Sequence, residues 1–263
     1  IDYVEGMLDE FPIKIEGTTQ TPAAEDLFVE GKDEKLNKQD AQTFTTFVYK
    51  GLFACKRARP DIHTAISSLC TRVKSPNQDD WKKLIRMMKY LNGTRKDELI
   101  LSAENPHVIK WYVDSAFAVH PDFKSHTGAT MTYGGGTPIS VSRKQKLNTR
   151  SSTEAELVGV DDASVMILWT KLFMEAQGCD IQKNILYQDN KSTILLETNG
   201  KRSSGKRTRA FNIRYFFITD QIEKGNVSVK YCTTLEMIAD FMSKPLQGRL
   251  FVKFKKMIIG HVN

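Results

Sequence analysis

The chain has 263 residues, of which 40% are hydrophobic and 26% charged, and it carries a net charge of +7 with a pI near 9.1. This composition is typical of a globular protein. No stretch approaches the roughly 18 apolar residues of a membrane span, so we expect no membrane partner. The basic balance favours an acidic partner, most commonly nucleic acid, although charge alone leaves a basic protein without a nucleic-acid role equally open.

The start of the chain and its cysteines bear on its origin. The start of the chain shows neither the basic nor the apolar segment of a signal peptide. Because the chain begins with Ile1 rather than Met, we interpret it as a piece of a longer polypeptide or a trimmed form of the protein. The cysteines are widely spaced and form no C-x-x-C pair, which argues against a zinc site. They indicate reduced thiols in an intracellular protein. They are Cys55, Cys70, Cys179 and Cys232.

The first part of the chain divides into two segments. Residues 1–39 are polar and turn-rich after a short helical start, which predicts an irregular leader. Apolar residues then recur at helical spacing, as in Ile62, Ile66 and Leu69. We therefore predict a helical subdomain over 40–97, with its last helix stopping at Asn92-Gly93.

The pattern changes near residue 98 to the alternation of strands. We expect an α/β domain over 98–249 with a mixed sheet flanked by helices, followed by a tail at 250–263. A long helix follows the first strands, capped by Ser152 or Thr153, and its Trp169 fits an apolar stripe that we expect in the core rather than a stacking surface. Strands are predicted at 98–103, 108–117, 128–134, 137–144, 184–189 and 227–234, and helices at 151–178, 190–200, 210–226 and 234–248.

Four acidic residues occupy positions where such folds gather functional groups. Asp114 lies inside a strand, Glu156 early in the long helix, Asp189 at a strand-to-helix junction and Asp240 early in the last helix. Together they would repel one another unless cations neutralised them, and two Mg²⁺ ions would do so and would suit phosphodiester hydrolysis. Taken singly, Asp189 equally fits an N-cap, and Glu154 and Glu156 fit acids placed by the helix dipole. Asp240 by itself is better explained as a solvated helix acid, and Asp114 less readily as a hydrogen-bonded strand acid, because aspartate is disfavoured in a buried strand.

Several longer stretches resemble the ribonuclease H domain of Ty1/copia-type retrotransposon Pol polyproteins. The combination of "SSTEAE" with "IADFMSKPL" is highly specific. Residues 40–97 are similar to the thumb or connection segment that precedes this domain after the reverse transcriptase palm. The matching stretches are "YVDSAFA", "KSHTGATMTYGGG", "SRKQKLNTRSSTEAELVGV", "YQDNKSTI", "RTRAFNIRYFFI" and "EMIADFMSKPL".

The resemblance implies a fold, a reaction and a site. It implies a five-stranded ribonuclease H-like sheet and hydrolysis of the RNA strand of an RNA–DNA hybrid with two Mg²⁺ ions, which Mn²⁺ could replace. The implied catalytic and metal-binding set is Asp114, Glu156, Asp189 and Asp240, with Glu156 chosen over Glu154. It also implies the reverse transcriptase palm of the same polyprotein as a partner, and an intracellular location in a cytoplasmic virus-like particle or the nucleus.

Basic and polar residues flank the predicted acidic site. Lysine and arginine there could follow the phosphates of a hybrid, whose selectivity should rest on A-form geometry and 2′-hydroxyl contacts. The alternative is that these segments are solvated turns. The predicted nucleic-acid-binding residues are Arg143, Lys144, Lys146, Ser152, Asn190, Lys201, Arg202, Lys206, Arg207 and Arg209.

One departure from the family pattern keeps a second function open. Relatives often carry "KHIDIRYHF" where this chain has "RAFNIRYFF", and both histidines are absent here. A domain that binds hybrids without cutting them, as an impaired relic or an accessory to a reverse transcriptase, therefore remains an alternative. A polymerase site is disfavoured, because Ser115 follows Asp114 where reverse transcriptases have a second aspartate. An integrase is disfavoured by the "STEAE" helix after the third strand.

Overall fold

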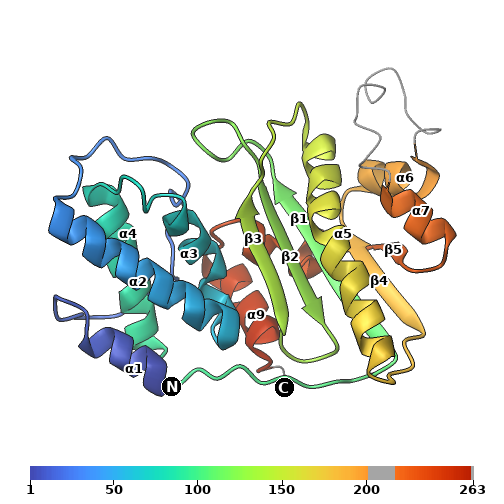
Figure 1. Ribbon diagram of the computed structural model, residues 1–263, viewed down its shortest axis with the longest axis horizontal. Helices are drawn as coiled ribbons and strands as arrows, with labels where there is room; N and C mark the ends of the chain where they lie inside the picture. Colours follow the sequence, from blue (N-terminus) through green and yellow to red (C-terminus); the bar gives the residue numbers. More distant parts are fainter. Residues whose placement is uncertain (201–216, 262–263) are drawn as a thin grey trace.

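The structure is a computed structural model that describes residues 1–200 and 217–261. A bundle of helices lies beside a five-stranded sheet, and the two parts contact each other along one edge of the sheet (Figure 1). The described helices and strands are α1 (Asp2–Asp9), α2 (Lys38–Arg57), α3 (His63–Cys70), α4 (Gln78–Gly93), β1 (Val108–Ala116), β2 (His126–Thr132), β3 (Ile139–Lys144), α5 (Ser152–Ala176), β4 (Lys183–Gln188), α6 (Lys191–Asn199), α7 (Phe217–Glu223), β5 (Ser228–Tyr231), α8 (Asp240–Ser243) and α9 (Gly248–Ile259).

The sheet has the order β3-β2-β1-β4-β5. Strand β1 pairs antiparallel with β2 and parallel with β4, and β4 pairs parallel with β5. This confirms the predicted mixed five-stranded sheet flanked by helices. The predicted strand at 98–103 is wrong, because this segment bonds elsewhere: Ile100 donates to the carbonyl of Ile259 at 2.8 Å and Ser102 to that of Gly135 at 3.0 Å.

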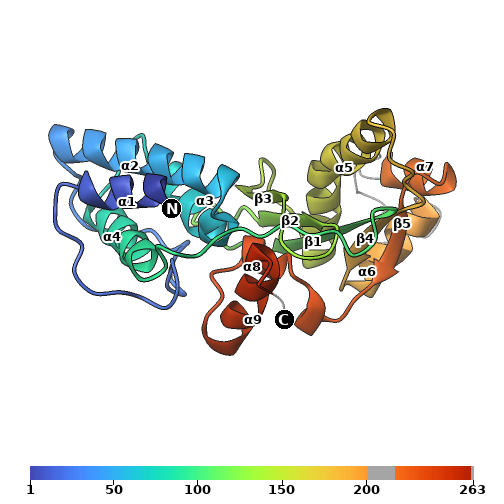
Figure 2. The ribbon, with the colours of Figure 1, turned by 90° about the horizontal axis from the view of Figure 1, so that it is seen from below.

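Helix α5 and the short helix α8 lie on opposite faces of the sheet (Figure 2). Alternation along β1 turns Trp111 and Val113 toward the core beneath α5, and Asp114 toward the face of α8. Helix α5 comes very close to β1, since a Cβ on Gly159 would lie 2.3 Å from Oγ of Ser115. The glycine thus lets the N-terminal half of α5, with Glu156, approach the strand that carries Asp114.

Two details of α5 differ from the sequence expectation. The N-cap is Ser151 rather than Ser152 or Thr153, and its hydroxyl accepts from the backbone of Glu154 at 3.2 Å. We also interpreted Trp169 as a core residue, but it is 51% exposed and stacks on Phe173 with the ring centroids 4.9 Å apart. The apolar stripe that we assigned to the core therefore continues around α5 onto the surface.

The C-terminal part of the chain is built differently from the expected helix at 234–248 and tail at 250–263. A turn of 3₁₀ helix, the short α8 and a separate helix α9 replace them. Phe251 and Phe254 of α9 and Phe241 of α8 are buried in the same apolar cluster as α2, α3 and α4. The core of the helical unit thus includes the end of the chain, and α8 belongs to both parts of the molecule.

Buried histidines lie where the helical unit meets β2 and β3. Nε2 of His120 is 3.0 Å from Nδ1 of His126, whose Nε2 is 2.8 Å from Oγ of Ser142. The ring of Phe28 packs on both imidazoles, with centroids 4.8 and 4.9 Å away. Burial and the charge of Lys144 lower the pKa of His120 to about 4, and burial and the proximity of His120 lower that of His126 to about 3.

We expect each of these two histidines to contribute stability that is lost in acid, against the opposite contribution of Glu156, Asp240 and Glu197, whose pKa values are raised. Below pH 6.5 the two histidines bind protons in the unfolded chain but stay neutral in the folded chain. The free energy of unfolding that they contribute above pH 6.5 is therefore lost as the pH falls toward 4. The expected loss is about 1.4 kcal/mol per pH unit for each histidine. Urea unfolding at pH 7.5, 6.5 and 5.5 measures this slope.

Two variants check the assignment. His126→Gln should flatten the slope by about 1.4 kcal/mol per pH unit, whereas Thr130→Val, a change at another buried position of β2, should leave it unchanged because it removes no titratable group. Equal slopes for the wild type and His126→Gln would contradict the prediction.

Candidate active site

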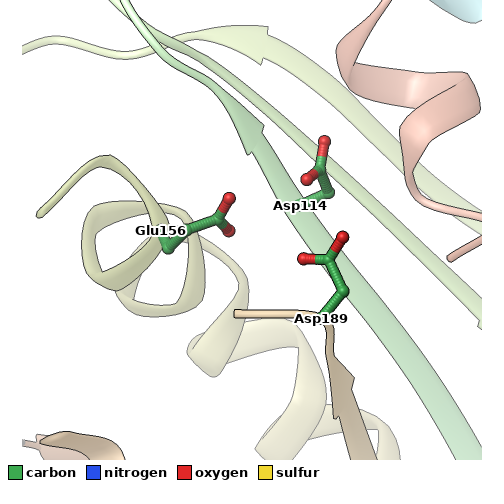
Figure 3. A group of neighbouring side chains, drawn as sticks. All are labelled: Asp114, Glu156 and Asp189. Carbon is green, nitrogen blue, oxygen red and sulfur yellow. The ribbon is translucent and has the colours of Figure 1, made fainter. Parts of the chain in front are cut away.

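Three carboxylates converge at the end of the sheet where β1, β4 and α5 meet (Figure 3). Each of Asp114, Glu156 and Asp189 offers a carboxylate oxygen, and these oxygens all lie within 4.8 Å of one another. Asp114 is 2% exposed and Glu156 is 5% exposed. The structure therefore brings together three of the four acidic residues that the sequence singled out.

Local structure explains why each carboxylate faces this point. Asn190 caps α6, accepting from the backbone of Ser192 at 3.0 Å and Thr193 at 3.2 Å, so Asp189 is not the N-cap. The carboxylate of Asp189 instead accepts from Oγ1 of Thr234 at 2.9 Å. This hydrogen bond links Asp189 to the segment that follows β5.

Glu154 and Glu156 have separate roles in α5. The carboxylate of Glu154 accepts from the backbone N–H of Arg150 at 2.7 Å, as expected for an acid at a helix start. Glu156 is turned inward, and its Oε2 is buried with no hydrogen-bond partner in the described part of the chain. Burial, together with the charges of Asp114 and Asp189, raises the pKa of Glu156 well above its ordinary value, while the backbone N–H of Ser115 opposes that rise.

The fourth acid, Asp240, stands on the other side of Asp114. Burial and the charge of Asp114 raise the pKa of Asp240 to about 7. Its Oδ1 accepts from Nζ of Lys244 at 2.8 Å, and the same ammonium lies 3.1 Å from Oδ2 of Asp114. The hydroxyl of Ser243 also donates to Oδ2 of Asp114. Sequence reasoning missed Ser243 and Lys244, although the i, i+4 spacing of Asp240 and Lys244 is the usual sign of a helical ion pair.

A glycine on β2 allows α8 to reach Asp114. Gly128 is the register partner of Asp114. A Cβ at this position would lie 2.6 Å from the carbonyl oxygen of Ala239 and 2.6 Å from the backbone nitrogen of Ser243. The backbone of α8 therefore rests directly on β2 beside the site. A glycine inside a strand pattern is a usual sign of close backbone approach, and this signal was present in the sequence.

The donor set fits a divalent cation that prefers oxygen ligands. All three groups are carboxylates, which suit Mg²⁺ or Mn²⁺ better than softer metals. A bound cation would also satisfy the buried Oε2 of Glu156 and offset the mutual repulsion that raises its pKa. The residues present thus fit the metal that the sequence analysis expects.

Unlike the three carboxylates, the predicted nucleic-acid-binding residues do not come together at one place in the described part of the chain. Arg143 pairs with Asp162 at 2.5 Å, and Lys144 pairs with Asp122 at 2.8 Å. As neighbours on a strand they point to opposite faces of the sheet. Lys146 and Ser152 are exposed, and Asn190 is used as a helix cap. The remaining five, Lys201, Arg202, Lys206, Arg207 and Arg209, lie outside the described residues.

Taken together, a mixed sheet of this order, with helices on both faces and acids meeting beside its central strand, defines a ribonuclease H-like fold. No protein-family model matches the chain. Solved structures similar to it include ribonuclease H1 LC11 from compost, at 14% identity and a TM-score of 0.40, covering 52% of this chain and 92% of that one. A foamy virus protease–reverse transcriptase matches at 14% identity and a TM-score of 0.34, covering 90% of this chain and 28% of that one.

Curated relatives are more informative. The chain is 28% identical over 268 residues to the Pol polyprotein of transposon TNT 1-94 from Nicotiana tabacum, covering 99% of this chain and 20% of the relative. It is 31% identical over 202 residues to that of transposon RE2 from Arabidopsis thaliana, covering 76% and 14%. It is 25% identical over 226 residues to the Ty1-NL2 Gag-Pol polyprotein of Saccharomyces cerevisiae, covering 83% and 13%.

The chain belongs to the Ty1/copia-type Pol polyproteins. It spans a fifth or less of the length of these curated relatives. In the described residues, no helix is both long enough and apolar enough to cross a membrane.

Proposed function

We propose that this chain is the ribonuclease H part of a retrotransposon Pol polyprotein and cuts the RNA strand of RNA–DNA hybrids. One observation supports this most directly: oxygens of Asp114, Glu156 and Asp189 lie within 4.8 Å of one another at the end of the central strands. The family membership supports the same reaction, because reverse transcription produces the hybrid on which such a domain acts.

Asp114, Glu156 and Asp189 would hold a Mg²⁺ ion, which Mn²⁺ could replace. When bound, the ion lowers the pKa of a water ligand and offsets charge on the phosphoryl oxygens. The chain's own residues position the carboxylates: Thr234 holds Asp189, Ser243 holds Asp114 and the N–H of Ser115 holds Glu156. Attack by water on phosphorus then leaves a 5′-phosphate and a 3′-hydroxyl.

The second Mg²⁺ expected from the sequence would use Asp240 as a ligand. In the structure Asp240 is bonded to Lys244, so the acids fall into a group of three and a pair that share Asp114. We further propose that the hybrid crosses the site near the exposed Lys146, and that the reverse transcriptase palm of the same polyprotein is its partner. The activity would then be exercised inside the cell, in a virus-like particle or the nucleus.

A panel of substrates tests this function. The full chain in Mg²⁺ is offered a labelled RNA–DNA hybrid, single-stranded RNA, double-stranded RNA and double-stranded DNA. We expect cleavage of the RNA strand of the hybrid alone, because A-form shape and 2′-hydroxyls distinguish the hybrid from DNA, and the DNA strand distinguishes it from RNA duplexes. Binding of the hybrid without cleavage in Mg²⁺ or Mn²⁺ would instead support the accessory, non-cutting domain.

A further inference from the structure

The position of Lys244 suggests that it acts as a built-in cation. Its Nζ lies 2.8 Å from Oδ1 of Asp240 and 3.1 Å from Oδ2 of Asp114, between two carboxylates that are 3% and 2% exposed. That is the place where a second divalent ion would have to bind. An ammonium group there offsets the repulsion of the two acids, as an ion would.

The backbone holds Lys244 in this place. Pro245 follows it and confines it to extended conformations, and Lys244 has φ −134° and ψ 145°. Its N–H donates to the carbonyl of Asp240 at 3.0 Å, and the preceding helix rests on Gly128. A fixed turn therefore sets the backbone position from which the Lys244 side chain, 39% exposed, reaches the two acids.

The partners of Asp114 divide the site in two. Oδ2 of Asp114 is bonded to both Ser243 and Lys244. Asp240 is not among the carboxylates whose oxygens lie within 4.8 Å of one another, whereas Glu156 and Asp189 are. Among the four acids, Glu156 alone has a buried oxygen, Oε2, without a hydrogen-bond partner in the described residues, and Glu156 belongs to the group of three. Within the described residues, Glu156 therefore lacks a cationic partner, whereas Asp240 already has Lys244.

We propose that Lys244 occupies the cation position between Asp114 and Asp240, so that the substrate-free protein binds one divalent ion, held by Asp114, Glu156 and Asp189. This inference rests on the proposed metal-dependent function. In this proposal Lys244 is a positioning residue that limits the number of bound divalent ions to one. In the substrate-free protein Asp240 then anchors Lys244, and a second ion at Asp240 would require Lys244 to move away.

Counting bound Mn²⁺ tests the proposal without measuring activity. The full chain is titrated with Mn²⁺, and free ion is followed by electron paramagnetic resonance. We expect one ion per chain in the wild type, two in Lys244→Met, and one again in Lys244→Met/Asp240→Asn. Asp240→Asn alone should keep one ion, while Asp189→Asn should weaken or abolish its binding. Circular dichroism on each sample confirms that the variants are folded.

Two controls separate a local effect from a general loss of charge. Lys171→Met removes a partly buried lysine that pairs with Glu175 at 3.1 Å on α5, and it should keep one ion. Lys244→Arg retains a cation and should also keep one.

The outcomes distinguish this inference from the function on which it rests. Two ions in the wild type, or a single ion in Lys244→Met, would overturn the role of Lys244 and leave the metal-dependent function standing. Loss of an ion in Asp240→Asn would overturn it as well. No bound ion in the wild type would overturn both this inference and the metal site of the proposed function.

Discussion

Glu156→Gln should reduce cleavage of an RNA–DNA hybrid by about a thousandfold or more, while Glu154→Gln should change it by no more than about threefold. Losing a metal ligand removes several kcal/mol of transition-state stabilisation, and each 1.4 kcal/mol is tenfold in rate. The two glutamates are two residues apart on α5, but Glu154 bonds to the backbone of Arg150 and Glu156 faces Asp114 and Asp189. Single-turnover cleavage in Mg²⁺ measures both.

Although Glu156→Gln should lose cleavage activity, the thermal stability of the metal-free protein should stay the same or rise. Burial and neighbouring negative charge raise the pKa of Glu156, so in the metal-free protein its ionised form is disfavoured above the ordinary pKa of 4.5. An isosteric amide removes that cost, and the metal-free variant should melt at the same temperature as the wild type or higher at pH 8. An inactive variant that also melts lower would indicate a structural role for Glu156.

Gly128→Ala should destabilise the fold by about 1–3 kcal/mol and disable the site. The added Cβ would meet backbone atoms of α8, which cannot move aside as a side-chain tip could: Ala239 O and Ser243 N are each 2.6 Å away and Met242 C is 2.8 Å away. Displacing α8 also displaces Ser243 and Lys244 from Asp114. Urea unfolding and hybrid cleavage measure the two effects.

Gly6→Ala is the matched control for Gly128→Ala. Gly6 lies inside α1, and a Cβ there has nothing within 4 Å. Alanine is the better helix former, so this variant should be more stable by about 0.5–1 kcal/mol and fully active. If Gly128→Ala behaved like Gly6→Ala, the close packing of α8 on β2 would be wrong.

The elements around the acids could be predicted, because their periodicity is strong. Strand alternation around Asp114 and the long helical pattern around Glu156 both rest on local sequence, and the structure has β1 and α5 there. The 98–103 segment shows where this fails. Its apolar residues follow the pattern of a strand, but its backbone forms hydrogen bonds with the end of α9 and with the β2–β3 turn. These tertiary contacts override the local strand preference.

The position of the Lys244 ammonium between Asp114 and Asp240 could not be predicted from sequence periodicity. Lys244 looks like an ordinary surface lysine after a short helix, and only the approach of α8 to Gly128 turns it toward two buried acids. The helical unit posed a similar problem. Residues 250–263 contain apolar residues at helical spacing, but their burial against α2–α4 depends on contacts about 200 residues distant in the chain.

The most direct test of the proposed active site is cleavage of one labelled RNA–DNA hybrid by the wild type and by Asp189→Asn, each in Mg²⁺ and in EDTA. The three-carboxylate site predicts cutting by the wild type in Mg²⁺ alone, with hybrid binding retained by Asp189→Asn. Cutting that persists in EDTA, or in Asp189→Asn at the wild-type rate, would contradict it.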